Sequence, residues 1–486
     1  MGAEKQRVGV YRQLELFKDY PVSRSHDATG KGGTGAGTCE ERQASTASTE
    51  KRALAQDLME RVCNLANLNR AYKYVKANKG SPGVDGITVG ELREWLRIHK
   101  DELIASLLEG TYQPMPVKRV DIPKPGGGVR QLGIPTVVDR LVQQAILQVL
   151  NPHIDPTFSD SSFGFRPGRS AHDALEQASR HVAEGQTIVV DCDLEKFFDR
   201  VNHDVLMSRL ARRVGDKRLL KIIRRFLESG VMINGVCIEQ YKGTPQGGPL
   251  SPLLANILLD DLDKELEKRG HCFCRYADDC NIYVCTKAAG ERVLASITRF
   301  LERRLRLRVN YQKSAVAHVS ERKFLGYRLH TGGRLLIAPK SLERAKDRIR
   351  EITRRNSALP FEKRIKKLNE FLSGWIMYYR LAQGRKRVEK LEEWMRRRLR
   401  CARIKQCKRT ATVAKFLMDC GIPEWRSWLM ALSGKGWWRK AASPQAHDAM
   451  PKEWFDKQGL ISLTERYLEL KSNGNRRGTE QVCPVV

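Results

Sequence analysis

The sequence has no long apolar segment, no pair of cysteines separated by two residues and comparatively few acidic residues. No apolar run approaches the ~20 residues that a membrane-spanning helix needs. Residues 1–6 have neither the apolar core of a secretion signal nor the hydroxyl residue of a myristoylation signal. These absences predict a cytoplasmic protein with no membrane partner.

Twelve cysteines are scattered along the 486 residues, and no two have the two-residue spacing of common zinc sites. Four of them lie around one acidic pair, and their spacing matches no common zinc site: Cys272, Cys274, Cys280 and Cys285. Small buried thiols on strands explain them better, so no zinc is expected.

Positive charge is in large excess, with 87 Lys and Arg against 56 Asp and Glu and a net charge of +31. Because 41% of the residues are apolar, the chain has enough material for folded domains. A folded protein with this charge favours an extended anionic partner, and nucleic acid is the favoured one. Residues 341–410 alone carry 23 basic and 8 acidic residues, which is too one-sided for simple ion pairing on a solvated helix face.

The length predicts two to four domains at ~100–200 residues each. Residues 1–55 are rich in Gly, Ser and Thr and are expected to form a weakly structured tail. Seven of the eight tryptophans lie beyond residue 370, among Lys and Arg side chains. Two interpretations stay open for this end of the chain: stacking on bases, or a small aromatic core.

Acidic residues follow two predicted strands. Residues 187–193 alternate apolar side chains and end in Asp191 and Asp193, which share a face. Asp278 and Asp279 lie between apolar runs, which predicts the tip of a β-hairpin. Asp is also common in ordinary turns, so the pair alone does not decide. Together with the earlier strand, however, these carboxylates suit two Mg²⁺ ions, as two-metal nucleotidyl transfer requires.

Two glycine-containing segments suggest a nucleotide site. Residues 117–123 and 129–135 are predicted strands joined by the glycine-rich tip 124–128, with flanking cations. Such a tip can approach a triphosphate, although most glycine turns are only turns and the spacing is not that of a Walker loop. Residues 243–252 open a strong predicted helix.

A further helix is expected after the first acidic strand, with its cap near Asn202. The adjacent His203 has two open roles, as a general base or as a structural hydrogen-bonding residue near the cap. The structural role is favoured.

In chain order, residues 190–199, 243–248, 276–279 and 324–327 resemble the blocks of bacterial group II intron reverse transcriptases. Residues 369–379 resemble the maturase (thumb) segment of intron-encoded proteins, and the likeness extends from about residue 55 to the mid-400s. No segment resembles the H-N-H endonuclease domain that ends many relatives. The resemblance therefore implies the endonuclease-lacking, group IIC-like branch.

The resemblance implies an α+β right-hand polymerase. Fingers and palm with an antiparallel sheet are expected over residues 56–335, an α-helical thumb or maturase domain over 336–412, and a small basic DNA-binding domain over 413–486. The implied function is RNA-directed DNA synthesis combined with binding of the parent group II intron RNA, to assist its splicing and to copy it during retrohoming. The implied partners are that intron RNA, an RNA template, a DNA primer, target DNA and dNTPs. The protein is expected to associate with the nucleoid when it acts on DNA. Whether it dimerises stays open.

Two rival functions are a reverse transcriptase recruited to phage defence and a splicing-only RNA-binding maturase with a vestigial polymerase site. The maturase-like thumb argues against the first. The intact aspartates argue against the second.

The resemblance also implies roles for individual residues. Asp193, Asp278 and Asp279 match the catalytic aspartates that hold two Mg²⁺ ions. Other residues match the nucleotide site: Phe198 for exclusion of a ribose 2′-hydroxyl, Gln246 beside the incoming nucleotide, Lys124 and Arg130 at its triphosphate, and Lys313, whose protonating or phosphate-binding role stays open. The basic thumb supplies the residues expected on nucleic acid: Arg385, Lys386, Arg387, Arg396, Arg397, Arg398 and Arg400.

Overall fold

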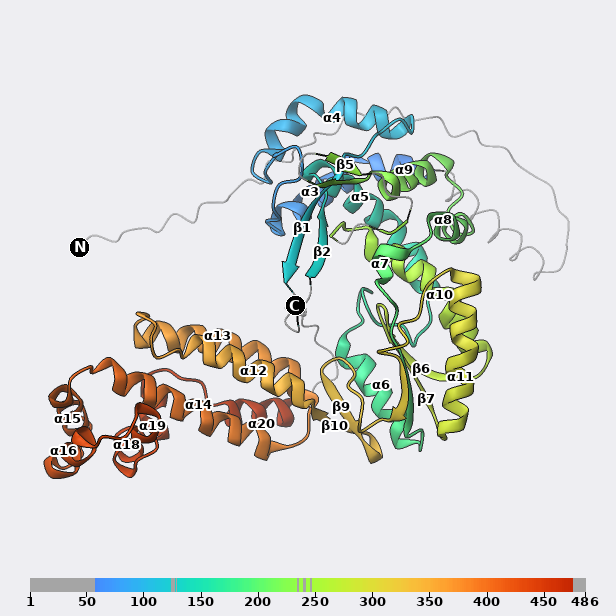
Figure 1. Cartoon of the computed structure of the whole chain (residues 1–486). Coiled ribbons are helices and arrows are strands. Elements are labelled where there is room, and N and C mark those ends of the chain that lie inside the picture. Colours follow the sequence, from blue (N-terminus) through green and yellow to red (C-terminus); the bar gives the residue numbers. More distant parts are fainter. Residues whose placement is uncertain are drawn as a thin grey trace, which may run out of the picture. The chain divides into compact units, whose positions relative to one another are not determined.

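The computed structural model describes residues 57–123, 127, 129–233, 236–238, 242–244 and 247–474 (Figure 1). The predicted tail at residues 1–55 lies outside them. The described chain divides into two compact units. The first contains the residues up to Arg169 with Asp191–Ile282 and Glu291–Ala315, and the second contains Ser170–Val190, Tyr283–Gly290 and the residues from Val316 onward.

The first unit is largely helical, and side-chain caps set the starts of several helices. Asn64 accepts a hydrogen bond from the N–H of Ala66 at the start of α3, and Thr136 accepts one from Asp139 at the start of α5. The helices of this unit are α2 (Leu58–Cys63), α3 (Leu65–Ala77), α4 (Leu92–Leu108), α5 (Val137–Ile154), α7 (Phe197–Arg200), α8 (His203–Ala211), α9 (Lys217–Glu228), α10 (Ser251–Lys268) and most of α11 (Lys287–Phe300).

A four-stranded sheet in the first unit has the strand order β2-β1-β4-β5. Its strands are β1 (Val117–Pro123), β2 (Val129–Ile134), β4 (Val231–Ile233) and β5 (Val236–Ile238). β1 and β2 are antiparallel, with Pro123 opposite Val129, whereas β1 and β4 are parallel. The predicted β1–β2 hairpin is therefore confirmed.

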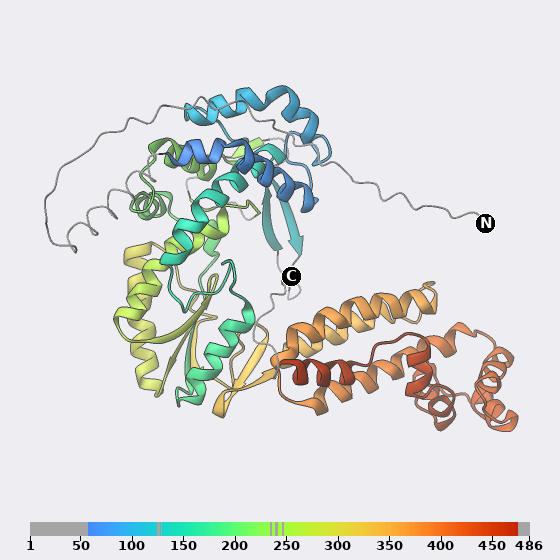
Figure 2. The same cartoon turned by 180° about the vertical axis from the view of Figure 1, so that it is seen from behind.

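A second four-stranded sheet carries the acidic residues and has the order β6-β7-β3-β8. Its strands are β3 (Ile188–Cys192), β6 (Cys272–Tyr276), β7 (Asp279–Val284) and β8 (Ala315–His318). Helix α10 packs against β6 (Figure 2). The apolar stripe predicted for this helix is buried, and the predicted α+β class is confirmed.

The second unit begins with α6 (Ala171–Ala183) and contains the two-stranded sheet of β9 (Tyr327–His330) and β10 (Arg334–Ile337). The helices that follow are α12 (Pro339–Ile352), α13 (Phe361–Tyr378), α14 (Arg385–Gln406), α15 (Thr410–Asp419), α16 (Glu424–Leu432), α17 (Trp437–Lys440), α18 (Pro444–Ala449), α19 (Lys452–Lys457) and α20 (Leu463–Gly474). Helix α14 contacts α12, α17 and α20. It is therefore covered on several sides.

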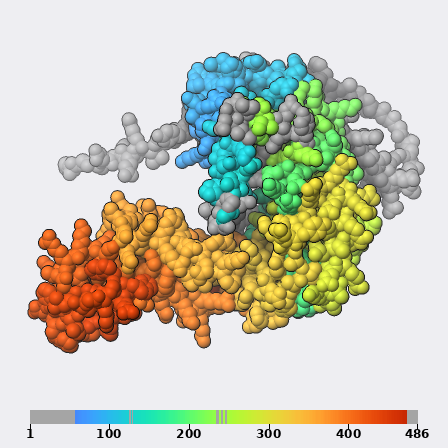
Figure 3. Space-filling view, viewed as in Figure 1, coloured from blue at the N-terminus to red at the C-terminus, as the bar shows by residue number. Residues whose placement is uncertain are grey.

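Aromatic side chains join the C-terminal helices to α13. The Trp454 ring lies 5.6 Å from Phe361, 6.4 Å from Phe416 and 5.0 Å from Phe455, measured between ring centroids. In the space-filling view the C-terminal helices (red) and α12–α13 (orange) form a continuous surface (Figure 3). None of the helices in the described part of the chain has the length and apolarity needed to span a membrane.

Candidate active site

Asp193 directly follows β3 and is anchored through its backbone. Its N–H donates to Ser314 Oγ at 3.0 Å, and its carbonyl accepts from the N–H of Asn310 at 2.8 Å. The side chain of Asp193 is 30% exposed, and Lys313 Nζ lies 3.7 Å from its Oδ2. The end of β3 is thus tied to the 310–314 turn, and that turn brings Lys313 beside the carboxylate.

The β6–β7 connection is a tight turn formed by Ala277 and Asp278, so the predicted hairpin is confirmed. Ala277 has φ +58, a left-handed conformation that costs a non-glycine residue about 1–2 kcal/mol. Gly164 packs directly on this turn, because a Cβ at Gly164 would lie 2.2 Å from the Ala277 nitrogen. Asp278 is half-buried and Asp279 is exposed. The acidic turn therefore has a strained backbone at Ala277, and Gly164 packs closely against it.

The electrostatics connect the two acidic segments. Burial raises the pKa of Asp278 above its usual value, and the negative charge of Asp193 raises it further. The guanidinium groups of Arg130 and Arg275 oppose this rise. Asp193, Asp278 and Arg130 therefore share one electrostatic environment, although they come from three separate strand ends.

This environment fits a divalent cation. Two ionised carboxylates in a partly buried site repel each other unless positive charge is added between them. All three expected ligands are carboxylates, the hard oxygen donors that suit Mg²⁺. Among the described residues, no three His, Cys, Asp or Glu side chains already converge as a complete metal site. The aspartates would share the coordination with substrate phosphates and water.

Phe198 lies in the single-turn helix α7, beside the start of the 243–252 segment. Its ring packs edge-on against Phe197 at 5.1 Å, and its carbonyl accepts from the N–H of Thr244 at 2.7 Å. A Cβ at Gly247 would lie 2.6 Å from the carbonyl oxygen of Gly133 in β2. The residues on either side of Gln246 thus contact α7 and β2. Gln246 itself, like Lys124, lies outside the described residues.

His203 has the structural role that the sequence favoured. It is buried at the first position of α8, and its Nε2 lies 2.7 Å from the carbonyl oxygen of Gly243. Asn202 caps the same helix by accepting from the N–H of Val205. This pair fixes α8 to the segment that approaches Phe198.

Two kinds of residue that hold the acidic strand ends were not among the predicted site residues. Asn310 and Ser314 anchor Asp193, and nothing in their spacing distinguished them from an ordinary turn. Arg275 did carry a signal, because it is a single charge inside the otherwise apolar strand β6. A charge in such a strand requires a buried partner.

The basic residues of α14 differ in how much solvent they meet. Arg385 and Lys386 are exposed, with Arg385 Nε 2.6 Å from Glu389 Oε1, and Arg387 is half-buried. Further along the helix, the side chains bond within the protein. Arg396 pairs with Glu392, and Arg398 donates to Thr353 Oγ1 at 2.8 Å. The displayed positive charge is therefore concentrated at the start of α14.

Arg400 is a correction to the expected set of nucleic-acid contacts. It is 5% exposed, its Nε donates to the carbonyl of Met450 at 3.0 Å, and its guanidinium lies over Phe455. Burial, with help from the neighbouring Arg396, lowers its pKa to about 10. Its guanidinium points into the C-terminal helices because α14 is covered there, which sequence periodicity did not show.

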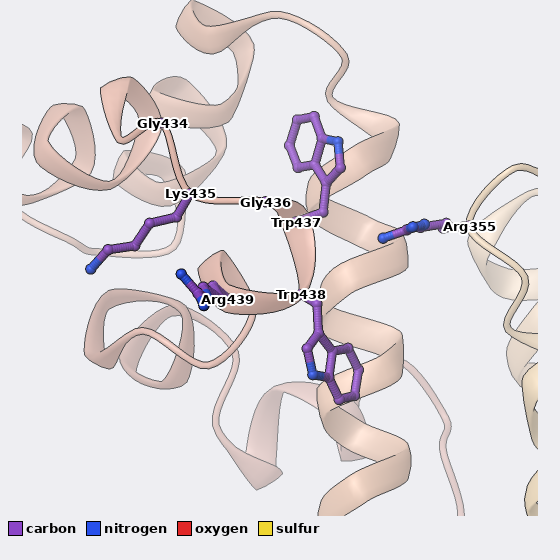
Figure 4. A pocket seen from close by; sticks show the side chains of 7 residues that line it. All are labelled: Arg355, Gly434, Lys435, Gly436, Trp437, Trp438 and Arg439. Atoms are coloured by element: carbon purple, nitrogen blue, oxygen red, sulfur yellow. The ribbon is translucent and has the colours of Figure 1, made fainter.

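The C-terminal helices contain a basic, aromatic pocket of about 550 Å³. Figure 4 shows the rings of Trp437 and Trp438 pointing in opposite directions, with Lys435 and Arg439 extending to one side. Trp438 is stacked by Arg397 at 4.1 Å. Trp425 is 70% exposed, whereas Trp454 belongs to the aromatic cluster described above. The aromatic-core interpretation is therefore confirmed for Trp454, and stacking on bases stays a prediction for the exposed tryptophans.

Comparison with known proteins identifies two regions. Residues 122–329 match the reverse transcriptase (RNA-dependent DNA polymerase) family, and residues 342–421 match the maturase-specific domain of group II introns.

The chain is also similar to individual proteins. Protein YkfC of Escherichia coli K12 is 33% identical over 327 residues, covering 59% of this chain and 86% of YkfC. The group II intron-encoded protein LtrA of Lactococcus lactis is 39% identical over 198 residues, covering 40% of this chain and 32% of LtrA. Among solved structures, a partial Cas6-RT-Cas1–Cas2 complex is similar with 27% identity and a TM-score of 0.34, covering 51% of this chain and 42% of that one.

Proposed function

This chain belongs to the family of group II intron reverse transcriptases and maturases, and from that membership we propose that it copies an RNA template into DNA and assists the splicing of its parent intron. The observation that carries the proposal is the match to both family domains, together with the neighbouring strands β3 and β7, next to which Asp193 and Asp278 lie. Negative charge from two strands lies near a cation from the β1–β2 hairpin. A nucleotide triphosphate with its metal ions needs that combination.

We assign Asp193, Asp278 and Asp279 as the ligands of two Mg²⁺ ions. When bound, such ions lower the pKa of a primer 3′-hydroxyl and neutralise the triphosphate and the leaving pyrophosphate. Lys313 pairs with Asp193, and its exposed ammonium group is assigned to bind a phosphate of the nucleotide. Arg130, at the hairpin, is assigned to the triphosphate together with Lys124.

Phe198 is assigned as the residue that selects deoxynucleotides. Its ring is half-buried and held by Phe197, and its carbonyl is bonded to the segment that leads to Gln246. A ring fixed in this way cannot move aside easily for a ribose 2′-hydroxyl. Steric exclusion by a rigid side chain discriminates between substrates without any added hydrogen bond.

Primer extension on an RNA template with Mg²⁺ tests the enzymatic proposal. Wild-type protein should extend the primer, and Asp278→Asn should abolish extension. Asp204→Asn is the matched control, because Asp204 is an exposed carboxylate paired with Arg224 and should leave extension unchanged. Absence of extension by the wild type, or equal extension by Asp278→Asn, would contradict the proposal.

Exposed cations at the start of α14 and the Trp437 pocket support binding of intron RNA and target DNA, and the binding should weaken steeply with salt. The maturase-specific domain favours this function over a phage-defence role. A splicing assay at low Mg²⁺ distinguishes the splicing-only alternative. If the wild type supports both splicing and extension and Asp278→Asn supports splicing alone, the chain has both activities; if the wild type supports splicing alone, the splicing-only alternative holds. If splicing proceeds equally without protein, the maturase proposal fails.

A further inference from the structure

Arg275 is a fully buried arginine three residues before Asp278, with 0% exposure. All five of its N–H donors are used. Nε donates to Asp263 Oδ1 at 2.7 Å, and Nη2 donates to Asp263 Oδ2 and to Ser162 Oγ. Nη1 donates to Asn256 Oδ1 and to the carbonyl of Ala277, both at 2.9 Å. The guanidinium therefore joins helix α10, the 161–164 segment and the acidic turn.

Burying an ion pair against a sheet has a large desolvation cost. Asp263 is also 0% exposed, so both charges have lost their water. A pair of this kind offsets the desolvation cost only when its geometry is good and its remaining donors are satisfied, and an apolar pair of similar volume is often at least as stable. The Arg275–Asp263 pair meets that condition, but its stability alone does not explain its position.

The contact between the Arg275 guanidinium and the acidic turn explains why the ion pair lies here. Ala277 has φ +58, and strained residues persist only where the surroundings fix them. The Ala277 carbonyl is held by Arg275, and its nitrogen is packed against Gly164. Gly164 is held in turn, because its carbonyl accepts from Asn256 Nδ2 at 2.9 Å. Arg275 thus holds the turn directly, and Asn256 holds it indirectly through Gly164 and Arg275.

We propose that Arg275 is a positioning residue for the metal-holding turn, fixing the backbone of Ala277 and thereby the carboxylates of Asp278 and Asp279. This inference rests on the proposed function, since it assumes that these carboxylates bind metal. Asn256 is part of the same device, because it orients Arg275 and supports Gly164. Partners of this kind behind metal ligands typically change metal affinity by about 10–100-fold when they are lost.

Metal binding measured without turnover provides the test, with Mn²⁺ followed by electron paramagnetic resonance in the full-length protein. Arg275→Lys keeps a positive charge beside Asp263 but cannot supply five planar donors. Asn256→Ala removes two hydrogen bonds and leaves the ion pair intact. Both should weaken Mn²⁺ binding about 10–100-fold. In primer extension, both should raise the Mg²⁺ concentration needed for half-maximal rate.

Arg364→Lys is the matched control. Arg364 is also 0% exposed and donates to three carbonyls, those of Leu359, Arg354 and Ser357. The Arg364→Lys substitution should lower the melting temperature as much as Arg275→Lys does. It should leave the Mn²⁺ affinity within twofold of the wild type. A general loss of stability and a specific loss of positioning are thereby separated.

The outcomes are distinct. If Arg275→Lys and Asn256→Ala bind Mn²⁺ within twofold of the wild type, the inference is refuted and the proposed function stands. If the wild type shows no Mn²⁺ binding that Asp278→Asn abolishes, the proposed function and the inference fall together. If Arg275→Lys does not fold, Asn256→Ala decides by the same criterion.

Discussion

Substitution of Gly164 by alanine should damage catalysis far more than folding. The added Cβ would lie 2.2 Å from the Ala277 nitrogen, and ordinary contact begins at 3.4 Å. The two backbones would therefore have to separate by about 1 Å, and any share of that shift taken by the turn displaces Asp278. Misplacement of reacting groups by about 1 Å costs roughly 10²-fold in rate. Overpacking of this size typically costs about 1–3 kcal/mol in stability.

The assay is single-nucleotide primer extension under saturating template and dNTP, with the melting temperature recorded on the same preparation. Gly164→Ala should lower kcat about 100-fold while the protein remains folded. The control is Gly374→Ala in helix α13, where no atom lies within 4 Å of the added Cβ. That change should raise stability by about 0.5–1 kcal/mol, because glycine disfavours helix interiors.

Two results would contradict this reasoning. If Gly164→Ala keeps full kcat, the acidic turn either tolerates displacement or does not position the reacting groups. If Gly164→Ala loses activity only in proportion to its unfolded fraction at the assay temperature, the contact matters for stability alone.

Four further predictions concern selectivity, pH, salt and stability. Phe198→Val should lower discrimination against ribonucleotides by at least roughly tenfold, measured as the ratio of kcat/KM for dNTP and rNTP. Because burial and Asp193 raise the pKa of Asp278, ionisation of Asp278 opposes folding of the metal-free protein. The metal-free protein should therefore gain stability as the pH falls through the raised pKa of Asp278. In EDTA, the melting temperature of Asp278→Asn should lie above that of the wild type at neutral pH and equal it at acid pH. Replacing Arg385 and Lys386 together by alanine should reduce the salt dependence of duplex binding by about 1–2 in the slope of log K against log salt, whereas a charge-neutral exposed substitution should not. Arg400→Ala should cost about 2–4 kcal/mol of unfolding free energy from the lost charged hydrogen bond and ring contact, with the salt slope unchanged in filter binding.

The sequence allowed prediction of the elements whose signals are local. The β6–β7 hairpin followed from two apolar runs around an acidic pair, and the stripe of α10 followed from helical spacing. The Arg275 network could not be predicted in this way. Its partners Ser162 and Asp263 lie 113 and 12 positions away in sequence, and only the fold brings them together.

The expected nucleic-acid contact of Arg400 failed for a related reason. Helix α14 has an apolar stripe at Val388, Leu391, Met395 and Leu399, but periodicity does not show that a basic residue beside this stripe is covered as well. The packing of α12, α17 and α20 around α14 decides it. Arg400 lies on a covered side, whereas Lys386 lies outside.

The stacks of arginine on tryptophan have a consequence for comparing members of the family. Trp394 lies 5.5 Å from the guanidinium carbons of both Arg350 and Arg398, and Trp438 lies 4.1 Å from that of Arg397. Lysine would preserve the charge at such positions but lose the flat stacking surface. Across related sequences, positions where arginine is never replaced by lysine should therefore be those where the guanidinium packs within the domain. Positions where arginine and lysine replace each other should be those that face the nucleic acid.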